Sequence, residues 1–278
     1  MRRNRRSVVP VASLAIHLSA CASHERAPIP EPRPVQPVEP APRPVRPVDP
    51  APVQPEATAP APVPLPEPVS REMFPGVRLV RDVDGRQFVE VDGFVPIMDD
   101  PQAPDVYLEL IMCRRDTRDH EVLVATDAKA SHIHAALLLL GLSEGHPGRW
   151  HVENRRLIPE PPEGDAVTVE FVWEQGGETM TAHPSEWVKN LADGTRLPRG
   201  EWLFAGSVET DHPVFPYGAD GSGNVVGLTT FGDEVLAYPT VISPEAAIDE
   251  PVWGADFDHV PPFGTAVVVR LIPVTGGP

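Results

Sequence analysis

Cysteine is scarce in this chain, which has two among its 278 residues, Cys21 and Cys113. Iron–sulfur clusters are held by sets of cysteine thiolates, and the cysteine-rich zinc sites also need several of them. One copy of the chain cannot supply such a set. The sequence therefore predicts no iron–sulfur cluster and no cysteine-rich zinc site.

Basic residues are also few, with 23 lysines and arginines against 40 aspartates and glutamates and a formal net charge of −17 at pH 7. Between residues 71 and 278 the counts are 15 and 34, which gives a formal charge near −19. An acidic surface of this kind repels nucleic acid and anionic lipid, so neither is expected as a partner. Divalent cations and basic partners remain compatible with it.

The N-terminus has no apolar run long enough to span a bilayer core of ~30 Å as a helix. Four arginines among residues 2–6 precede a short apolar run, Val8–Leu18, which ends in Leu18-Ser19-Ala20-Cys21. This order resembles the lipobox of bacterial lipoprotein precursors. The resemblance implies a signal peptide over residues 1–20, a lipid on Cys21, and an exported protein that the lipid anchors in the cell envelope. Ala22 follows the cysteine, which implies the outer membrane in a cell with two membranes.

Proline is concentrated in one region, because 17 of the 37 prolines lie between residues 28 and 68. Proline fixes φ and removes a backbone donor, so this stretch builds neither helix nor sheet. An extended polyproline-like segment rises ~3.1 Å per residue, or roughly 120 Å over this length. We therefore expect residues 21–70 to be a lipidated N-terminus and an extended linker that hold a globular domain, residues 71–278, away from the lipid.

The remaining residues are rich in predicted strands. Residues 77–80 and 87–91 flank Asp84-Gly85, which is a hairpin signal, and residues 107–113 and 121–126 suggest a second hairpin. Further strands are expected at residues 166–174, 201–207, 224–230 and 265–272. Long loops are expected at 146–164 and 239–264.

One principal helix is expected at Ser131–Leu140, followed by Gly141 at the usual C-terminal position, with a short second helix at 184–189. Together these elements predict an α+β fold: a mainly antiparallel sheet with one principal helix packed on it, preceded by the proline-rich linker.

Several segments together resemble the YdjY-type domain, found in a family of exported bacterial proteins. They cover most of residues 88–239 and are, in order, Cys113 through His120-Glu121, Asp127-Ala128-Lys129, His132–Leu138, Trp187-Val188, Trp202–Ser207 and Asp220–Asn224. The chain departs from the family pattern at Thr229-Thr230-Phe231, where Ser-Asn-Phe is usual, and at Ala130, which replaces a proline. Because the family's molecular function is not established, the resemblance implies fold and compartment and says little of chemistry.

A predicted hairpin with a six-residue turn would place Cys113 opposite His120. A histidine beside a thiol can lower its pKa and produce a nucleophile, and the two side chains can also ligate a metal. Cys113, His120, Lys129 and His134 lie within about twenty residues of one another. Of these, Cys113, His120 and Lys129 are the candidate catalytic residues. The alternative is a cysteine packed as a small apolar residue beside a capping histidine.

The candidate metal ligands are Cys113, His120 and His134. His134 lies on the same predicted helix face as Leu137 and Leu138, so it is expected to point inward, and a divalent metal ion is the one cofactor that the sequence leaves open.

Asp220 and Asn224 join His134 as candidate binding residues. The run from Asp220 imitates the start of a calcium loop, but Val225 and Phe231 occupy the positions that need glycine and a bidentate glutamate. A glycine-rich turn beside a ligand is the alternative.

Three hypotheses about function remain open. The first is a binding or assembly module on a proline stalk, with the membrane as partner through the Cys21 lipid and with envelope proteins or cell-wall components as ligands. The second is a metal- or thiol-dependent envelope hydrolase or transferase that uses the Cys113/His120/His134 region. The third is a purely structural envelope component.

Overall fold

The computed structural model describes residues 67–100, 102 and 105–274. The predicted signal peptide, Cys21 and the linker up to residue 66 lie outside the described residues. Strands account for 42% of the structure and helices for 11%. The predicted α+β fold with one principal helix on a sheet is therefore wrong, because the sheet closes on itself as a barrel.

Eight strands form the closed barrel. In spatial order they are β3 (Gln87–Phe94), β17 (Ala266–Pro273), β10 (Ala166–Gln175), β13 (Trp202–Phe204), β15 (Leu236–Ala237), β14 (Asn224–Gly227), β4 (Leu110–Arg114) and β5 (Val122–Thr126). The pairing of Phe94 in β3 with Ala125 in β5 closes the ring. Neighbours are antiparallel except β14–β15 and β4–β5, which are parallel.

The apolar face of the sheet was expected to be covered by a helix, and it is covered instead by the opposite strands of the barrel. In β17, Val267, Val269 and Leu271 are buried and alternate with partly exposed residues, so one face of the strand points into the core. A sheet with one apolar face must cover it, and closure lets the inner faces of opposite strands cover one another.

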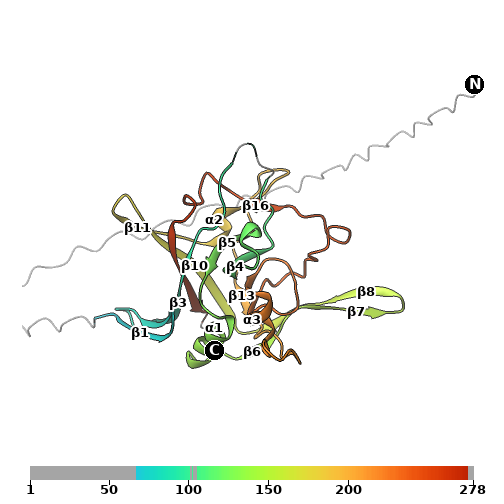
Figure 1. Cartoon of the computed structure of the whole chain (residues 1–278), viewed down its shortest axis with the longest axis horizontal. Coiled ribbons are helices and arrows are strands. Elements are labelled where there is room, and N and C mark those ends of the chain that lie inside the picture. The colour runs from blue at the N-terminus through green and yellow to red at the C-terminus, as the bar shows by residue number, and fades with distance from the viewer. Residues whose placement is uncertain (1–66, 101, 103–104, 275–278) are drawn as a thin grey trace, which may run out of the picture. The chain divides into compact units, whose positions relative to one another are not determined.

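The other strands lie outside the ring. β1 (Val69–Phe74) and β2 (Val77–Arg81) extend the sheet from β3, and β11 (Glu178–Ala182) pairs with β10. Three small sheets pair β12 (Val188–Asn190) with β16 (Trp253–Ala255), β6 (Glu144–His146) with β9 (Glu163–Gly164), and β7 (Arg149–Glu153) with β8 (Arg156–Glu160). The predicted loop at 146–164 therefore contains a hairpin, β7–β8, which projects from the body of the domain (Figure 1).

The helices are short. α1 (Ala130–Leu139) buries Ile133, Ala136 and Leu137 and contacts β2 and β3, and Gly141 follows it at φ +87°. The others are η1 (Asp119–Glu121), α2 (Pro184–Trp187) and α3 (Gly218–Ser222). Among the described residues, no helix has both the length and the apolar character that a membrane crossing requires.

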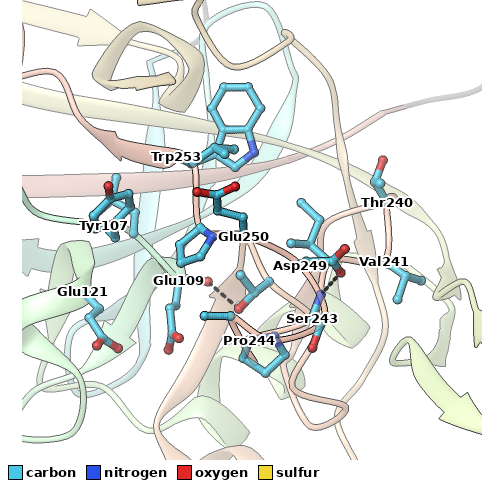
Figure 2. Close-up of a pocket in the computed structure, with 16 residues that line it drawn as sticks. Tyr107, Glu109, Glu121, Thr240, Val241, Ser243, Pro244, Asp249, Glu250 and Trp253 are labelled. Carbon is cyan, nitrogen blue, oxygen red and sulfur yellow. Dashed lines mark hydrogen bonds between the residues drawn. The ribbon is translucent and has the colours of Figure 1, made fainter. Parts of the chain in front are cut away.

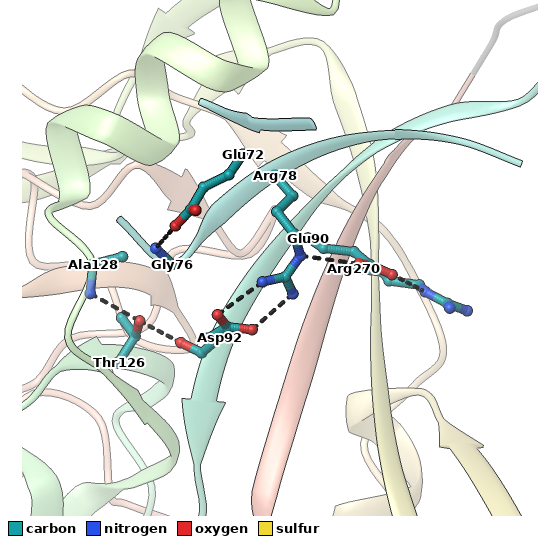
Figure 3. A network of polar contacts seen from close by, with 8 residues as sticks. All are labelled: Glu72, Gly76, Arg78, Glu90, Asp92, Thr126, Ala128 and Arg270. Atoms are coloured by element: carbon teal, nitrogen blue, oxygen red, sulfur yellow. Dashed lines mark hydrogen bonds and ion pairs between the residues drawn. The ribbon is translucent and has the colours of Figure 1, made fainter. Parts of the chain in front are cut away.

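A ladder of charged side chains crosses the four neighbouring strands β2, β3, β17 and β10. Figure 3 shows its members Arg78, Glu90, Asp92 and Arg270. Arg78 in β2 binds both carboxylate oxygens of Asp92 in β3, at 2.8 and 2.7 Å. Arg270 in β17 reaches Glu90 in β3 at 3.1 Å and Glu170 in β10 at 3.2 Å. Opposite charges on facing positions support the strand register, although each exposed pair contributes at most about 1 kcal/mol.

The second predicted hairpin is wrong in its topology. β4 and β5 run parallel, with Met112 beside Val124 and Cys113 beside Ala125. The segment that joins the two strands passes through η1 and returns to the start of β4. β5 therefore begins beside the first residue of β4, and not beside the last, as a hairpin would require. Cys113 and His120 are consequently not cross-strand partners.

Candidate functional site

A cavity of about 530 Å³ lies beside the start of β4, next to η1 and the segment that leads into β16 (Figure 2). Four carboxylates line it: Glu109, Glu121, Asp249 and Glu250. Tyr107 and Trp253 also line it, and no lysine or arginine is among its described lining residues. Buried volume, aromatic surface and a few polar groups are the usual features of a small-ligand site. We call this cavity the acidic pocket.

The backbone at Glu109 is tied to two other segments of the chain. Its amide donates to the carbonyl of Glu121 at 3.0 Å, and its carbonyl accepts from the amides of Leu228 and Thr229 at 3.0 and 2.9 Å. The amide of Leu108 donates to the carbonyl of Trp253 at 2.9 Å. These bonds fix the position from which the Glu109 side chain enters the pocket.

The opposite wall belongs to the long segment before β16. The Thr230 amide donates to the Ile242 carbonyl at 2.7 Å, and the Ser243 amide donates to the Asp249 carboxylate at 2.7 Å. Figure 2 shows Asp249 and Ser243 across the pocket from Glu109. The predicted loop at 239–264 thus has a defined course, because side chains and backbone groups along it pair with one another.

Arg118 partly neutralises one end of the pocket. Its Nη1 lies 2.8 Å from Glu109 Oε2 and 3.7 Å from Glu121 Oε2, and its guanidinium stacks 4.3 Å over the Phe231 ring. Burial, together with a hydrogen bond to Glu121 and repulsion from it, raises the pKa of Glu109 to about 7, while Arg118 opposes the shift. Glu109 therefore exchanges its proton near neutral pH, where a cationic ligand would favour the ionised form.

Cys113 and His120 occupy different surroundings. Cys113 is fully buried with Leu110, Val122 and Ala125, and burial raises the pKa of its thiol to about 11. His120 has a side chain that is 76% exposed and lies 3.3 Å from Glu121. The geometry gives Cys113 the surroundings of a packed small residue, and His120 contacts Glu121, which lines the acidic pocket.

His134 lies in a second polar cluster on α1. Its Nδ1 is 2.8 Å from the Tyr217 hydroxyl, and its Nε2 is 2.9 Å from Glu144 Oε2. The ring makes edge contacts with Phe204 and Tyr217 beside a cavity of about 480 Å³. Three segments that carry the family resemblance, around residues 131–138, 202–207 and 220–224, meet here.

Asp220 and Asn224 have structural partners near that cluster. The Asp220 carboxylate accepts from the amide and hydroxyl of Ser131 at 2.9 and 2.6 Å, which satisfies a free amide in the first turn of α1. Asn224 is buried, and its Nδ2 donates to Asp233 at 2.7 Å while its Oδ1 has no described partner. Lys129 is exposed directly before α1.

The candidate metal ligands Cys113, His120 and His134 thus contact three different sets of residues. Within the described part of the chain, no group of three or more histidines, cysteines, aspartates and glutamates is arranged to hold a metal ion.

Sequence reasoning missed the acidic pocket itself. Glu109 had one available signal, because it interrupts the apolar run from Tyr107 to Cys113. No sequence signal pointed to Asp249, Glu250 and Trp253, because they lie more than a hundred residues further along the chain and only the folded structure brings them beside Glu109.

Comparison with known protein families identifies the domain. The profile of the YdjY domain matches residues 77–272, which include every strand of the barrel apart from the final residue of β17. No curated protein and no solved structure matches the chain. The match spans well over half of the sequence and agrees with the resemblance carried by its motifs, so the chain belongs to the YdjY domain family.

Proposed function

We propose that this protein is an exported, lipid-anchored envelope protein whose YdjY domain binds a cationic ligand, bearing a guanidinium or amine, in the acidic pocket. The observation that carries the proposal is the pocket's composition: four carboxylates beside two aromatic rings, with Arg118 as the neighbouring cation. Carboxylates pair with guanidinium groups in a bidentate geometry, and aromatic faces attract cations.

The arrangement supports binding better than thiol chemistry. A nucleophilic cysteine needs a lowered pKa and access to substrate, whereas Cys113 is fully buried and has a pKa of about 11. The pairing of Glu109 with Glu121 favours acid–base catalysis as a second candidate function, since a glutamic acid with a pKa of about 7 can donate a proton at neutral pH.

Calorimetric titration of the full chain with n-butylguanidinium tests the pocket, with neutral n-butylurea as the matched ligand. We expect the cation to bind and the urea not to bind. Because Glu109 must ionise to pair with the cation, affinity should increase about tenfold from pH 6 to pH 8.

Two variants separate the pocket from general surface charge. Glu109→Gln should weaken binding and remove most of the pH dependence. Glu178→Gln, on the exposed strand β11, should bind as the wild type does. Equal binding of the cation and the urea, or an unchanged pH profile in Glu109→Gln, would refute the proposal for the pocket.

Lipid attachment has its own test. We expect the full chain, expressed in a lipoprotein-producing bacterium, to incorporate an alkyne-labelled fatty acid and to sediment with membranes. Cys21→Ser should abolish the label, because that substitution removes the thiol that carries the lipid. Labelling that persists in Cys21→Ser would contradict the anchor.

A further inference from the structure

The β7–β8 hairpin, residues Arg149–Glu160, has no covering layer among the described elements. Its two strands form a separate two-stranded sheet and pair with each other alone. Asn154 and Arg155 make the turn at φ +49° and +62°, and Figure 1 shows the hairpin extending away from the barrel. An isolated two-stranded hairpin is marginally stable in water, so a partner surface would add to its stability. We call this hairpin the arm.

The two faces of the arm differ in character. The register pairs Trp150 with Pro159 and Val152 with Leu157, which places four apolar side chains on one face. Val152 is 74% exposed and Leu157 is 45% exposed. The opposite face contains the ion pair of Arg149 with Glu160, at 2.7 and 2.6 Å. That face also has His151 opposite Ile158 and, at the tip, Glu153 opposite Arg156. The face with the four apolar side chains is open to a partner.

The arm also differs in charge from the rest of the domain. It has three arginines against Glu153 and Glu160, a formal charge of +1, whereas residues 71–278 together have a formal charge near −19. Arg155 and Arg156 stand at the exposed tip, and neither forms an ion pair with a described residue. A cationic, partly apolar tip is complementary to an acidic, partly aromatic cavity.

The acidic pocket of the same domain is such a cavity. Its carboxylates outnumber Arg118, Tyr107 at its edge is 44% exposed, and Trp253 is half-buried. We propose that the arm of one copy docks in the acidic pocket of a second copy. Arg155 and Arg156 pair with the carboxylates, while Val152 and Leu157 cover Tyr107 and Trp253.

This inference rests on the proposed function, because it names the partner that supplies the cation. The arm and the pocket are different surfaces, so the contact is heterologous and builds rings or open chains of copies. Because the pairing is largely between exposed charges, it should weaken as salt is added.

Sedimentation velocity of the full chain in a non-ionic detergent tests the contact. At low salt, the wild type should have a mean mass above that of the monomer, rising with protein concentration. The double variant Arg155→Glu, Arg156→Glu should remain monomeric at the same concentrations. Arg199→Glu is the control, since its side chain is 73% exposed and belongs neither to the arm nor to the lining of the acidic pocket, and it should associate as the wild type does.

Charge reversal on the other partner completes the test. Glu250→Lys, at the exposed edge of the pocket, should also lower the mean mass towards that of the monomer, because it replaces one of the four carboxylates with a cation that repels Arg155 and Arg156. A monomeric wild type, or association that the arm variant leaves unchanged, overturns the docking. If n-butylguanidinium still binds the pocket in that case, the proposed function stands and only the self-association fails; if it does not bind, both fail.

Discussion

Replacing Gly164 with alanine is expected to lower the free energy of unfolding by roughly 3–5 kcal/mol, the largest effect of any single substitution considered for this domain. Gly164 lies in β9 at φ +141°, a conformation that side-chain-bearing residues rarely adopt. A Cβ at this position would collide with the carbonyl oxygen of Phe204, in the barrel strand β13. Neither backbone can move far, because Phe204 donates its amide to the Asp165 carbonyl at 2.8 Å.

A matched glycine separates the collision from the backbone strain. Gly177, in the turn between β10 and β11, has φ +86°, and no atom lies within 4 Å of the place where an added methyl group would stand. Gly177→Ala should therefore cost only about 1 kcal/mol. Chemical denaturation of the two variants and the wild type measures both effects. Equal losses in Gly164→Ala and Gly177→Ala would contradict the collision with Phe204.

Local patterns predicted individual elements well, because their causes are local. The hairpin of β2 and β3, the long strands β10 and β17, and helix α1 with its terminal glycine lie where apolar periodicity and turn residues indicate. Closure of the barrel depends on the pairing of β3 with β5 and on β15, a strand of two residues that no sequence pattern indicates. Strands of two or three residues have no detectable periodicity, so the sequence could not distinguish a sheet covered by a helix from a barrel.

The candidate site shows the same limit. His134 was expected to face inward, and it contacts Tyr217 and Glu144 from distant segments. The Cys113–His120 contact required an antiparallel hairpin, whereas β4 and β5 are parallel. Strands joined by a short connection are usually antiparallel. The segment through η1 instead returns the chain to the start of β4, and no turn motif in the sequence predicts this course. The acidic pocket depends on that same reversal, because it brings Glu121 beside Glu109.

Stability is expected to fall as the pH rises from about 5 to 8, and Glu234→Gln should remove much of that dependence. Glu234 is 1% exposed, and burial raises the pKa of its carboxyl to about 7, from an ordinary value of 4.5. The folded state therefore holds a proton that the unfolded state releases between these two pKa values. The free energy of unfolding is largest below pH 4.5 and decreases up to pH 7, by about 3 kcal/mol for this group alone.

Glutamine suits this position because the amides of Gly232 and Asp233 donate to Glu234 Oε2, at 2.8 and 3.1 Å, and an amide oxygen can accept both bonds. Glu234→Gln should consequently be more stable than the wild type at pH 8 and similar to it at pH 5. Glu109 also has a raised pKa of about 7, so Glu109→Gln should flatten the same profile by a smaller amount, because its side chain is less buried. Urea denaturation across this pH range measures how much each carboxyl group contributes to the pH dependence of the free energy of unfolding, with Glu178→Gln as the exposed control. A Glu234→Gln profile parallel to that of the wild type would mean that the buried carboxyl does not change its protonation on unfolding.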